Sequence, residues 1–275
     1  MKNNFLAVLL PVYAKDSSVY FTQSVGSILN QTVSDFTLYI GVDGPVTEEL
    51  TESINGFECD PRVRPVWFPE NRGLARVLND LIDIATRDGA ELFARMDADD
   101  ISMPDRFEKQ IKFLEENKNI DVVGGAISEI DEEGNSRNKI VVYPSTPDAC
   151  RAFFAKRNPH AHPAVMFRKS FFDKIGHGYR PEYRQNQDTM LWLDGFANGT
   201  QNANIQDVVL KFRMTESLFK RRRNGWTFAK KQLKDRLTIN RTLGYGFKAD
   251  VFGFAMFCLL ISPTSLRKLA YRLFR

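Results

Sequence analysis

Cysteine is scarce in this chain of 275 residues. The three cysteines, Cys59, Cys150 and Cys258, lie far apart, so their spacing indicates neither a disulfide framework nor a zinc site. The pattern of a secretory signal peptide is also missing, because the first apolar run, residues 5–10, is short and leads directly into a strand-like segment. Together these features predict a protein of the reducing cytoplasm.

Long hydrophobic runs are missing as well. The longest, residues 251–261, is interrupted by Gly253 and is shorter than the roughly 18 residues that cross a bilayer. Hydrophobic residues make up 43% of the chain and charged residues 26%, which is ordinary for a globular protein with a substantial core. These values exclude a disordered chain and a multi-pass membrane protein.

The net charge of +4 is small but unevenly distributed. Residues 211–275 contain 16 basic and three acidic residues, whereas residues 1–210 contain 22 basic and 31 acidic ones. We therefore predict an acidic body at residues 1–215 and a basic helical tail at residues 216–275.

The tail is expected to meet something anionic. It contains a basic run at residues 220–223, a helical pattern at residues 226–243 and an amphipathic segment at residues 266–275. Such mixtures of basic and apolar residues are typical of segments at a membrane surface, so we expect peripheral docking on the cytoplasmic face of an inner membrane. A helical subdomain packed on the body is the alternative. No nucleic-acid-binding motif accompanies the charge, so nucleic acid is not expected as a partner.

Strand and helix patterns alternate in the first half of the body, which predicts an α/β fold with a mainly parallel sheet. Apolar runs predict buried strands at residues 5–12, 37–42, 63–68 and 92–96. Between and after them, helical patterns lie at residues 17–30, 47–54, 73–86 and 104–116. After residue 121 the pattern predicts a hairpin of residues 122–130 and 139–143, strands at 164–167 and 207–212, and a helix at 189–196.

Polar residues follow the expected parallel strands. They are Tyr13, Asp43, Asn71-Arg72 and the run Asp97 to Asp100. Ligands of such sheets bind outside the carboxyl ends of the strands, so we expect these residues to converge on one crevice.

The acidic run Asp97-Ala98-Asp99-Asp100 contains three carboxylates in four residues. They repel one another unless a cation neutralises them, and Mg²⁺ or Mn²⁺ is the kind of ion that carboxylate oxygens prefer. The alternative is a loop whose acids cap the next helix. A calcium-binding loop is excluded, because the glycine and the distant glutamate of that motif are missing.

Several motifs surround this acidic run. In chain order they are Pro11-Val12-Tyr13, Ser24 to Thr32, Asp43-Gly44, Asn71-Arg72-Gly73-Leu74-Ala75 with Asn79, Arg95 to Asp100, His162-Pro163, and Gln187-Asp188 with Leu191-Trp192-Leu193. Over about residues 5–215 this string resembles glycosyltransferase family 2, a family of inverting enzymes with the GT-A fold, a Rossmann-like nucleotide-binding sheet.

The resemblance implies a role for each matching residue. Asp188 corresponds to the general base, and Asp97 and Asp99 to the residues that touch the ribose and the metal-bound diphosphate, with Mn²⁺ or Mg²⁺ as cofactor. Nucleotide-sugar binding is implied for Pro11, Tyr13, Asp43, Asn71, Arg72, Asp97, Ala98 and Asp99. On the acceptor side, the implied residues are His162, Gln187 and Trp192.

Each of these roles has a structural alternative. Asp43 could hold a turn, Arg72 could pair with a surface acid, and Asp188 could cap its helix. His162 could be a structural histidine, Trp192 is of a kind more often found in a core, and Arg95 is expected to be structural or a charge partner of the acids. Gln187 departs from the family, which commonly has glutamate there, and this leaves the general base itself in place.

The resemblance predicts transfer of one hexose or N-acetylhexosamine from a nucleoside-diphosphate sugar, UDP-linked by preference, to a glycan hydroxyl. The tail resembles those of bacterial enzymes that build O-antigen or capsule repeat units on polyprenyl diphosphate, which implies a lipid-linked acceptor. The processive Gln-x-x-Arg-Trp motif is absent, so a polymer-extruding synthase is not expected. A sugar-phosphate nucleotidyltransferase is the first alternative, but residues 11–16 lack its glycine-rich phosphate loop. A non-catalytic membrane-surface protein on the same scaffold is the second.

Overall fold

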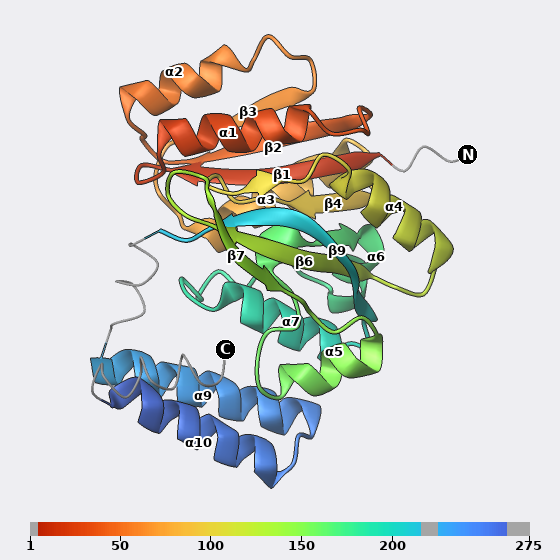
Figure 1. Cartoon of the computed structure of the whole chain (residues 1–275), viewed down its shortest axis with the longest axis vertical. Helices are drawn as coiled ribbons and strands as arrows, with labels where there is room; N and C mark the ends of the chain where they lie inside the picture. Colours follow the sequence, from red (N-terminus) through yellow and green to blue (C-terminus); the bar gives the residue numbers. More distant parts are fainter. Residues whose placement is uncertain (1–4, 216–224, 263–275) are drawn as a thin grey trace. The chain divides into compact units, whose positions relative to one another are not determined.

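A computed structural model describes residues 5–215 and 225–262 (Figure 1). The chain divides into two compact units. The first comprises residues 1–151 and 158–214, and the second comprises residues 152–157 and 215–275. The basic run at 220–223 and the amphipathic segment at 266–275 lie outside the described residues.

Four parallel strands in the order β3-β2-β1-β4 form the first half of the sheet. They are β1 (Leu6–Tyr13), β2 (Phe36–Asp43), β3 (Val63–Phe68) and β4 (Leu92–Arg95). The helices that connect them are α1 (Ser18–Leu29), α2 (Glu48–Gly56) and α3 (Leu74–Arg87). The predicted strand–helix alternation of this half is therefore confirmed.

The sheet continues from β4 in the order β8-β6-β9-β5, with β7 paired to β6. Six of the nine strands in the described residues run in one direction, and β5, β7 and β8 run in the other. The bounds are β5 (Ile101–Ser102), β6 (Val122–Ile130), β7 (Ser136–Val141), β8 (Met166–Arg168) and β9 (Asn202–Arg213). The sheet is mixed and mainly parallel, as predicted.

Burial explains why the apolar runs became central strands. Residues 6–10 of β1 and residues 38–43 of β2 are buried throughout, because both faces of these strands are covered. Helix α3 buries one stripe, which includes Val77, Leu78 and Leu81, and leaves its other side polar. The shorter helices of this unit are α4 (Arg106–Glu116), η1 (His162–Ala164), α6 (Lys169–Ile175) and α7 (Gln187–Ala197), and α5 (Pro147–Phe154) runs into the second unit.

The structure differs from the sequence prediction at two strands. Strand β9 begins at Asn202, five residues earlier than expected, because its ladder with β6 includes polar residues that break the apolar pattern. The two-residue strand β5 was missed, since it is too short to show a period. Arg213 ends β9 inside the first unit.

The second unit contains a helical hairpin of α9 (Gly225–Leu243) and α10 (Phe247–Ile261). The two helices lie side by side in Figure 1, and Gly253 allows them to approach, since a Cβ there would lie 3.1 Å from Cγ of Arg236. Between the two helices, Asn240 Nδ2 donates a hydrogen bond to Asp250 Oδ1 at 2.8 Å. The rings of Trp226 and Phe257 are also in contact, with 5.3 Å between their centroids. Within the described residues, no helix is both long and apolar enough to span a membrane.

Candidate functional site

The strand ends meet as the sequence predicts. Tyr13 and Asp43 are register partners at the ends of β1 and β2, and Asn71 Nδ2 donates to the carbonyl of Asp43 at 3.2 Å. The acidic run follows β4, the other neighbour of β1, so it lies at the same edge of the sheet. Pro11 and Tyr13 are half-buried at this edge, and Ala98 is buried between the acids.

Asp43 fastens the loop that precedes α3. Its Oδ1 accepts the backbone N–H of Arg72 at 2.7 Å and its Oδ2 accepts that of Gly73 at 2.9 Å. Gly44 is needed beside it, since it has a φ of 81° and a Cβ there would lie 2.5 Å from the nitrogen of Asn71. Asp43 therefore shapes the loop with both carboxylate oxygens, and each oxygen keeps one lone pair that could accept from a ligand.

The guanidinium of Arg72 already has two partners in this structure. It forms an ion pair with Asp80 of α3 and lies over the ring of Phe68, 4.4 Å from its centroid. Pairing with a surface acid was the alternative to nucleotide binding. The backbone of Arg72 stays beside Asp43, whereas its side chain would have to leave Asp80 to reach a ligand at the strand ends.

The three carboxylates of the acidic run gather into one cluster. Ligand oxygens of Asp97, Asp99 and Asp100 lie within 4.8 Å of one another. Burial and the charge of Asp97 raise the pKa of Asp99 to about 6, and burial with the charges of Asp99 and Asp97 raises the pKa of Asp100 well above its usual value. One oxygen of Asp100, Oδ2, is buried and has no hydrogen-bond partner among residues 5–215 and 225–262. A donor set made only of carboxylate oxygens fits Mg²⁺ or Mn²⁺.

Arg213, at the end of β9, contacts two residues of this cluster. Its backbone N–H donates to Oδ1 of Asp100 at 2.8 Å, and its Nε donates to the carbonyl of Asp99 at 2.8 Å. Its Nη1 reaches the carbonyl of Glu132 and its Nη2 the side chain of Gln23. Arg213 is almost fully buried, so its charge partly offsets that of the acids. Sequence reasoning missed it, because no motif marks a single arginine 113 residues from its partner.

One face of α1 braces the same run. Ser24 Oγ donates to the carbonyl of Asp97 at 2.9 Å, and Ser27 Oγ accepts the N–H of Ser102 at 2.9 Å. Gln31 donates to the carbonyl of Met103 at 2.7 Å and accepts the N–H of Phe107 at 3.1 Å. Ser24 and Ser27 are three positions apart and share one side of α1, and Gln31 follows the C-cap Asn30. The motif from Ser24 to Thr32 is thereby explained as a support for the acidic run.

Arg95, the last residue of β4, is a buried cation at the centre of the site. It is 1% exposed and forms an ion pair with Asp97, which confirms the expectation of a charge partner. The positive charge of Arg95 also opposes the rise in the pKa of Asp99 and of Asp188. Together with burial, it lowers the pKa of His162. Arg95 therefore acts on the acidic cluster and on residues of α7 and η1 at once.

Asp188 lies in the first turn of α7 and is half-buried. Its Oδ2 accepts a hydrogen bond from Asn158 Nδ2 at 2.9 Å, and the same amide holds the hydroxyl of Thr189 at 3.0 Å. The helix cap is Asn186, so Asp188 is not the cap itself. Burial raises the pKa of Asp188, and a backbone hydrogen bond from Thr189 and the charge of Arg95 oppose this rise. The result is a fixed carboxylate with enhanced basicity.

A buried tyrosine that the sequence did not indicate contacts His162. Tyr179 is buried, and its hydroxyl lies 2.7 Å from Nε2 of His162. Burial raises its pKa, Arg95 lowers it, and the charges of Asp188 and Asp97 both raise it further. Asn79 of α3 holds the backbone of Tyr179 with two hydrogen bonds of 2.6 and 2.8 Å. The backbone of Tyr179 is thereby fixed to α3, and its hydroxyl is held by His162.

Of the predicted acceptor-side residues, Trp192 is corrected. It has no exposed surface, and its ring stacks on that of Phe167 with 5.7 Å between the ring centroids. The ring centroids of His160 and His162 lie 4.9 Å and 6.2 Å from that of Trp192. A fully buried indole cannot form a platform for a sugar, so Trp192 supports the histidines instead. Gln187 is half-buried, and its Oε1 has no hydrogen-bond partner among the described residues. Burial and the charge of Arg95 hold the pKa of His162 well below its usual value, so its ring is neutral.

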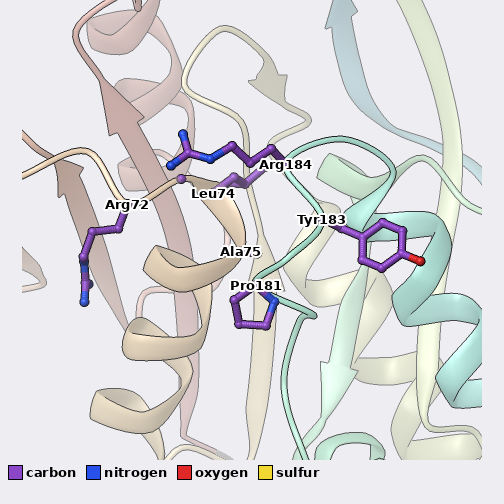
Figure 2. A pocket seen from close by; sticks show the side chains of 7 residues that line it. Arg72, Leu74, Ala75, Pro181, Tyr183 and Arg184 are labelled. Carbon is purple, nitrogen blue, oxygen red and sulfur yellow. The ribbon is translucent and has the colours of Figure 1, made fainter. Parts of the chain in front are cut away.

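A hollow of about 340 Å³ opens where the loop before α3 meets the loop before α7. It is lined by Glu70, Asn71, Arg72, Arg76 and Arg184. A smaller cavity of about 90 Å³ adjoins it, between the first turn of α3 and the segment from Pro181 to Arg184. Figure 2 shows Arg184 extending over the start of α3, whereas Arg72 points away from it.

Residues 7–176 of the chain match the model of glycosyl transferase family 2. Two relatives extend the similarity beyond this range. A UDP-Gal:alpha-D-GlcNAc-diphosphoundecaprenol beta-1,3-galactosyltransferase of Escherichia coli is 29% identical over 97% of this chain and 94% of its own. The amylovoran biosynthesis glycosyltransferase AmsE of Erwinia amylovora is 32% identical over 83% of each chain.

Solved structures share the fold. Staphylococcus aureus TarS in complex with UDP superposes with a TM-score of 0.65 at 14% identity, covering 95% of this chain and 76% of that one. The mannosyltransferase PcManGT of Pyrobaculum calidifontis, in complex with GDP-Man and Mn²⁺, gives a TM-score of 0.58 at 13% identity. The superposition covers 97% of this chain and 78% of that one. The predicted GT-A architecture is confirmed by this likeness.

Proposed function

Since this chain belongs to glycosyltransferase family 2, we propose that it transfers a single hexose or N-acetylhexosamine from a nucleoside-diphosphate sugar to a hydroxyl of a glycan acceptor. The observation that carries the proposal is that the described residues contain two separate carboxylate sites beside the buried Arg95, which pairs with Asp97 and whose charge also acts on Asp188. One is a cluster suited to a divalent cation, and the other is the single, half-buried Asp188. Sugar transfer needs both, in separate roles.

In this proposal the donor lies at the strand ends. Pro11, Tyr13 and Asp43 would border the nucleoside, with the loop of Asn71 and Arg72 beside them. Asp97 and Asp99 would hold Mn²⁺ or Mg²⁺, and Ala98 brings the backbone between them to the ligand. The cation, when bound, neutralises charge on the leaving diphosphate.

Asp188 is the proposed general base. Its carboxylate would take the proton of the acceptor hydroxyl as that oxygen attacks the anomeric carbon. The bond between that carbon and the diphosphate oxygen breaks, and the nucleoside diphosphate leaves on the opposite face of the sugar, so the anomeric configuration inverts. Asn158 and Thr189 fix the orientation of the base, and Gln187 and His162 are the nearest candidates for contact with the acceptor.

The relatives suggest which substrates to test first. The Escherichia coli relative is named for UDP-galactose and a diphosphoundecaprenol-linked acceptor, and the Erwinia relative for the biosynthesis of amylovoran. We extend this to a UDP-sugar donor, a polyprenyl-diphosphate-linked acceptor and a role in bacterial surface polysaccharide such as O-antigen or capsule. The reaction would then take place at the cytoplasmic face of the inner membrane.

The function is tested by incubating the full chain with UDP-, GDP- and dTDP-sugars and following nucleotide release, with Mn²⁺ or with EDTA. We expect release from one donor family that depends on the divalent ion and increases when a lipid-diphosphate-linked glycan is added. Formation of a nucleotide sugar from sugar phosphate would favour a nucleotidyltransferase instead. Absence of binding to every nucleotide sugar would contradict the proposal and favour a non-catalytic role.

Membrane docking of the second unit is proposed from the surface of α10. Phe247 is 80% exposed and Phe254 51%, and with Val251, Cys258 and Ile261 they form one stripe along the helix. Their spacing of three and four residues places them on one face. Basic residues of α9 and α10 accompany the stripe, namely Lys230, Lys231, Lys234, Arg241 and Lys248. This pairing of exposed aromatics and positive charge suits an anionic membrane interface.

Replacing Phe247 and Phe254 together by serine should weaken binding of the full chain to phosphatidylglycerol-rich vesicles by at least about tenfold. Each buried phenylalanine side chain contributes roughly 1.5–3 kcal/mol at an apolar interface. Co-sedimentation measures the effect, and Ile140→Ser, which removes an equally exposed apolar side chain from β7, serves as the control. Equal binding of the double variant and the wild type would contradict membrane docking through α10.

A further inference from the structure

His162 is flanked by the elements that carry the two carboxylate sites. Strand β8 runs antiparallel to β4, so the residues that precede β8 lie at the carboxyl end of β4, where the acidic run begins. The backbone N–H of Arg95 donates to the carbonyl of Val165 at 3.0 Å, which holds the segment of η1 at this edge. The ring of His162 also packs edge-on against that of Trp192, which lies one turn after Asp188 on α7.

One ring nitrogen of His162 is held by Tyr179, and the other is available to a ligand. Nε2 lies 2.7 Å from the Tyr179 hydroxyl, and the two rings meet edge-on with 5.5 Å between their centroids. Nδ1 has no hydrogen-bond partner in residues 5–215 and 225–262. It is not among the enclosed polar atoms of this half-buried residue, so a substrate group can reach it.

The surroundings of Tyr179 determine the direction of this hydrogen bond. The tyrosine is 3% exposed, and His162 is the one hydrogen-bond partner of its hydroxyl in the described part of the chain. If the hydroxyl accepted a proton from Nε2, its own proton would be buried without an acceptor, which is unfavourable. If it donates to Nε2 instead, both atoms are satisfied, and the single proton of a neutral imidazole is then on Nδ1.

Both groups are kept in the forms that this hydrogen bond requires. Burial raises the pKa of Tyr179, so its hydroxyl retains the proton, and burial with the charge of Arg95 keeps the ring of His162 neutral. The position of the hydroxyl is also fixed, because Asn79 accepts from the backbone N–H of Tyr179 at 2.6 Å and donates to its carbonyl at 2.8 Å. The tyrosine therefore presents a rigid hydrogen-bond donor to Nε2.

We propose that Tyr179 is a positioning residue that holds His162 as the Nδ1–H tautomer, whose N–H donates a hydrogen bond to a sugar hydroxyl of a substrate. This rests on the proposed function, in which the donor and the acceptor both bring sugar hydroxyls to the carboxylate sites. A neutral donor suits the neutral oxygen of a hydroxyl. Because Nδ1 already carries a proton, His162 does not compete with Asp188 for the proton of the acceptor.

Nitrogen-15 NMR of the full chain tests the tautomer without turnover. The chain contains three histidines, so the signals that disappear in His162→Asn identify this ring. We expect a protonated-type shift for Nδ1 and a pyridine-type shift for Nε2, and we expect Tyr179→Phe to remove this preference. Tyr39→Phe is the matched control, because Tyr39 is equally buried and its hydroxyl donates to Asp88. A proton on Nε2 in the wild type would overturn the proposal.

Steady-state kinetics identify which substrate supplies the hydroxyl. Tyr179→Phe and His162→Gln should raise the KM of that substrate about tenfold, the size of one lost hydrogen bond, with a smaller change in kcat. His162→Asn, which keeps a donor near the position of Nδ1, should recover part of the affinity. A rise confined to the nucleotide sugar identifies the donor, and a rise confined to the glycan identifies the acceptor.

The kinetic outcome separates this inference from the proposed function. Unchanged KM values for both substrates in an active enzyme would overturn the role of His162 and leave the transferase function standing. An inactive wild type would contradict the proposed function together with the sugar contact, whereas the tautomer is decided by NMR alone.

Discussion

Asp188→Asn should lower kcat by about 10²–10⁴-fold and leave the affinity for the donor nearly unchanged. A positioned general base contributes a factor of that size, and asparagine keeps the shape of the side chain but cannot take the acceptor proton. Single-turnover assays with saturating donor measure the loss, and nucleotide binding by calorimetry shows whether the donor site survives. Asp173→Asn is the matched control, because Asp173 is an exposed carboxylate whose partner is Lys169 on the surface.

The pH dependence of kcat gives a second measurement of the same residue. Burial raises the pKa of Asp188, so the carboxylate becomes protonated, and the base is lost, at a higher pH than for an ordinary aspartate. We therefore expect the acidic limb of the profile to fall as pH decreases through this raised pKa, and the limb to vanish from the residual activity of Asp188→Asn. Full activity of the variant at neutral pH would contradict the assignment of the base.

The second large effect is expected at the acidic cluster. Without a cation, burial and mutual repulsion oppose the ionisation of Asp99 and Asp100, so binding of Mn²⁺ to their carboxylates should stabilise the fold. At 100 times the dissociation constant the gain is about 2.7 kcal/mol, which corresponds to a rise in Tm on the order of 5 °C. Asp99→Asn should abolish most of this rise and reduce turnover on the order of 10³-fold, since metal stabilisation of a leaving diphosphate is worth several kcal/mol.

The rise in Tm should itself depend on pH. The pKa of Asp99 is about 6 in the folded protein against an ordinary value of 3.8, so its ionisation costs folding free energy as pH rises through this interval. The cation competes with the proton, and the Mn²⁺ effect should therefore be smaller at pH 5 than at pH 7.5. Differential scanning fluorimetry with EDTA as control measures it. Equal turnover in EDTA and in Mn²⁺ would show that the cluster does not serve a cation.

The sequence predicted the parallel half of the fold well because its signals are local. A strand covered on both faces must be apolar throughout, and β1 and β2 show this directly in the sequence. Strands β5 and β9 were missed or shortened for the opposite reason. They are held by ladder hydrogen bonds to partners distant in the chain, and such bonds leave no periodic mark on the residues.

The site divides in the same way. Residues that directly follow a strand, such as Asp43 and Asp97, could be placed at one edge, since the topology of a parallel sheet fixes where its strands end. Arg213, Asn158 and Tyr179 could not, because each contributes through a contact across the fold. Their residue types carry no signal of their own, and only the tertiary packing brings Arg213 to Asp100, Asn158 to Asp188 and Tyr179 to His162.

What the sequence determined by itself was therefore the chemistry available: an acidic run at a strand end, a lone aspartate before a helical pattern, and a basic, apolar tail. The tertiary structure decided how that chemistry is used. It turned Trp192 into a core residue, set Arg72 against Asp80, and placed Arg184 over the start of α3. Composition and local pattern indicate how strongly a segment prefers burial or a given backbone conformation. The direction of a charged side chain depends instead on the charges of neighbouring residues from other elements.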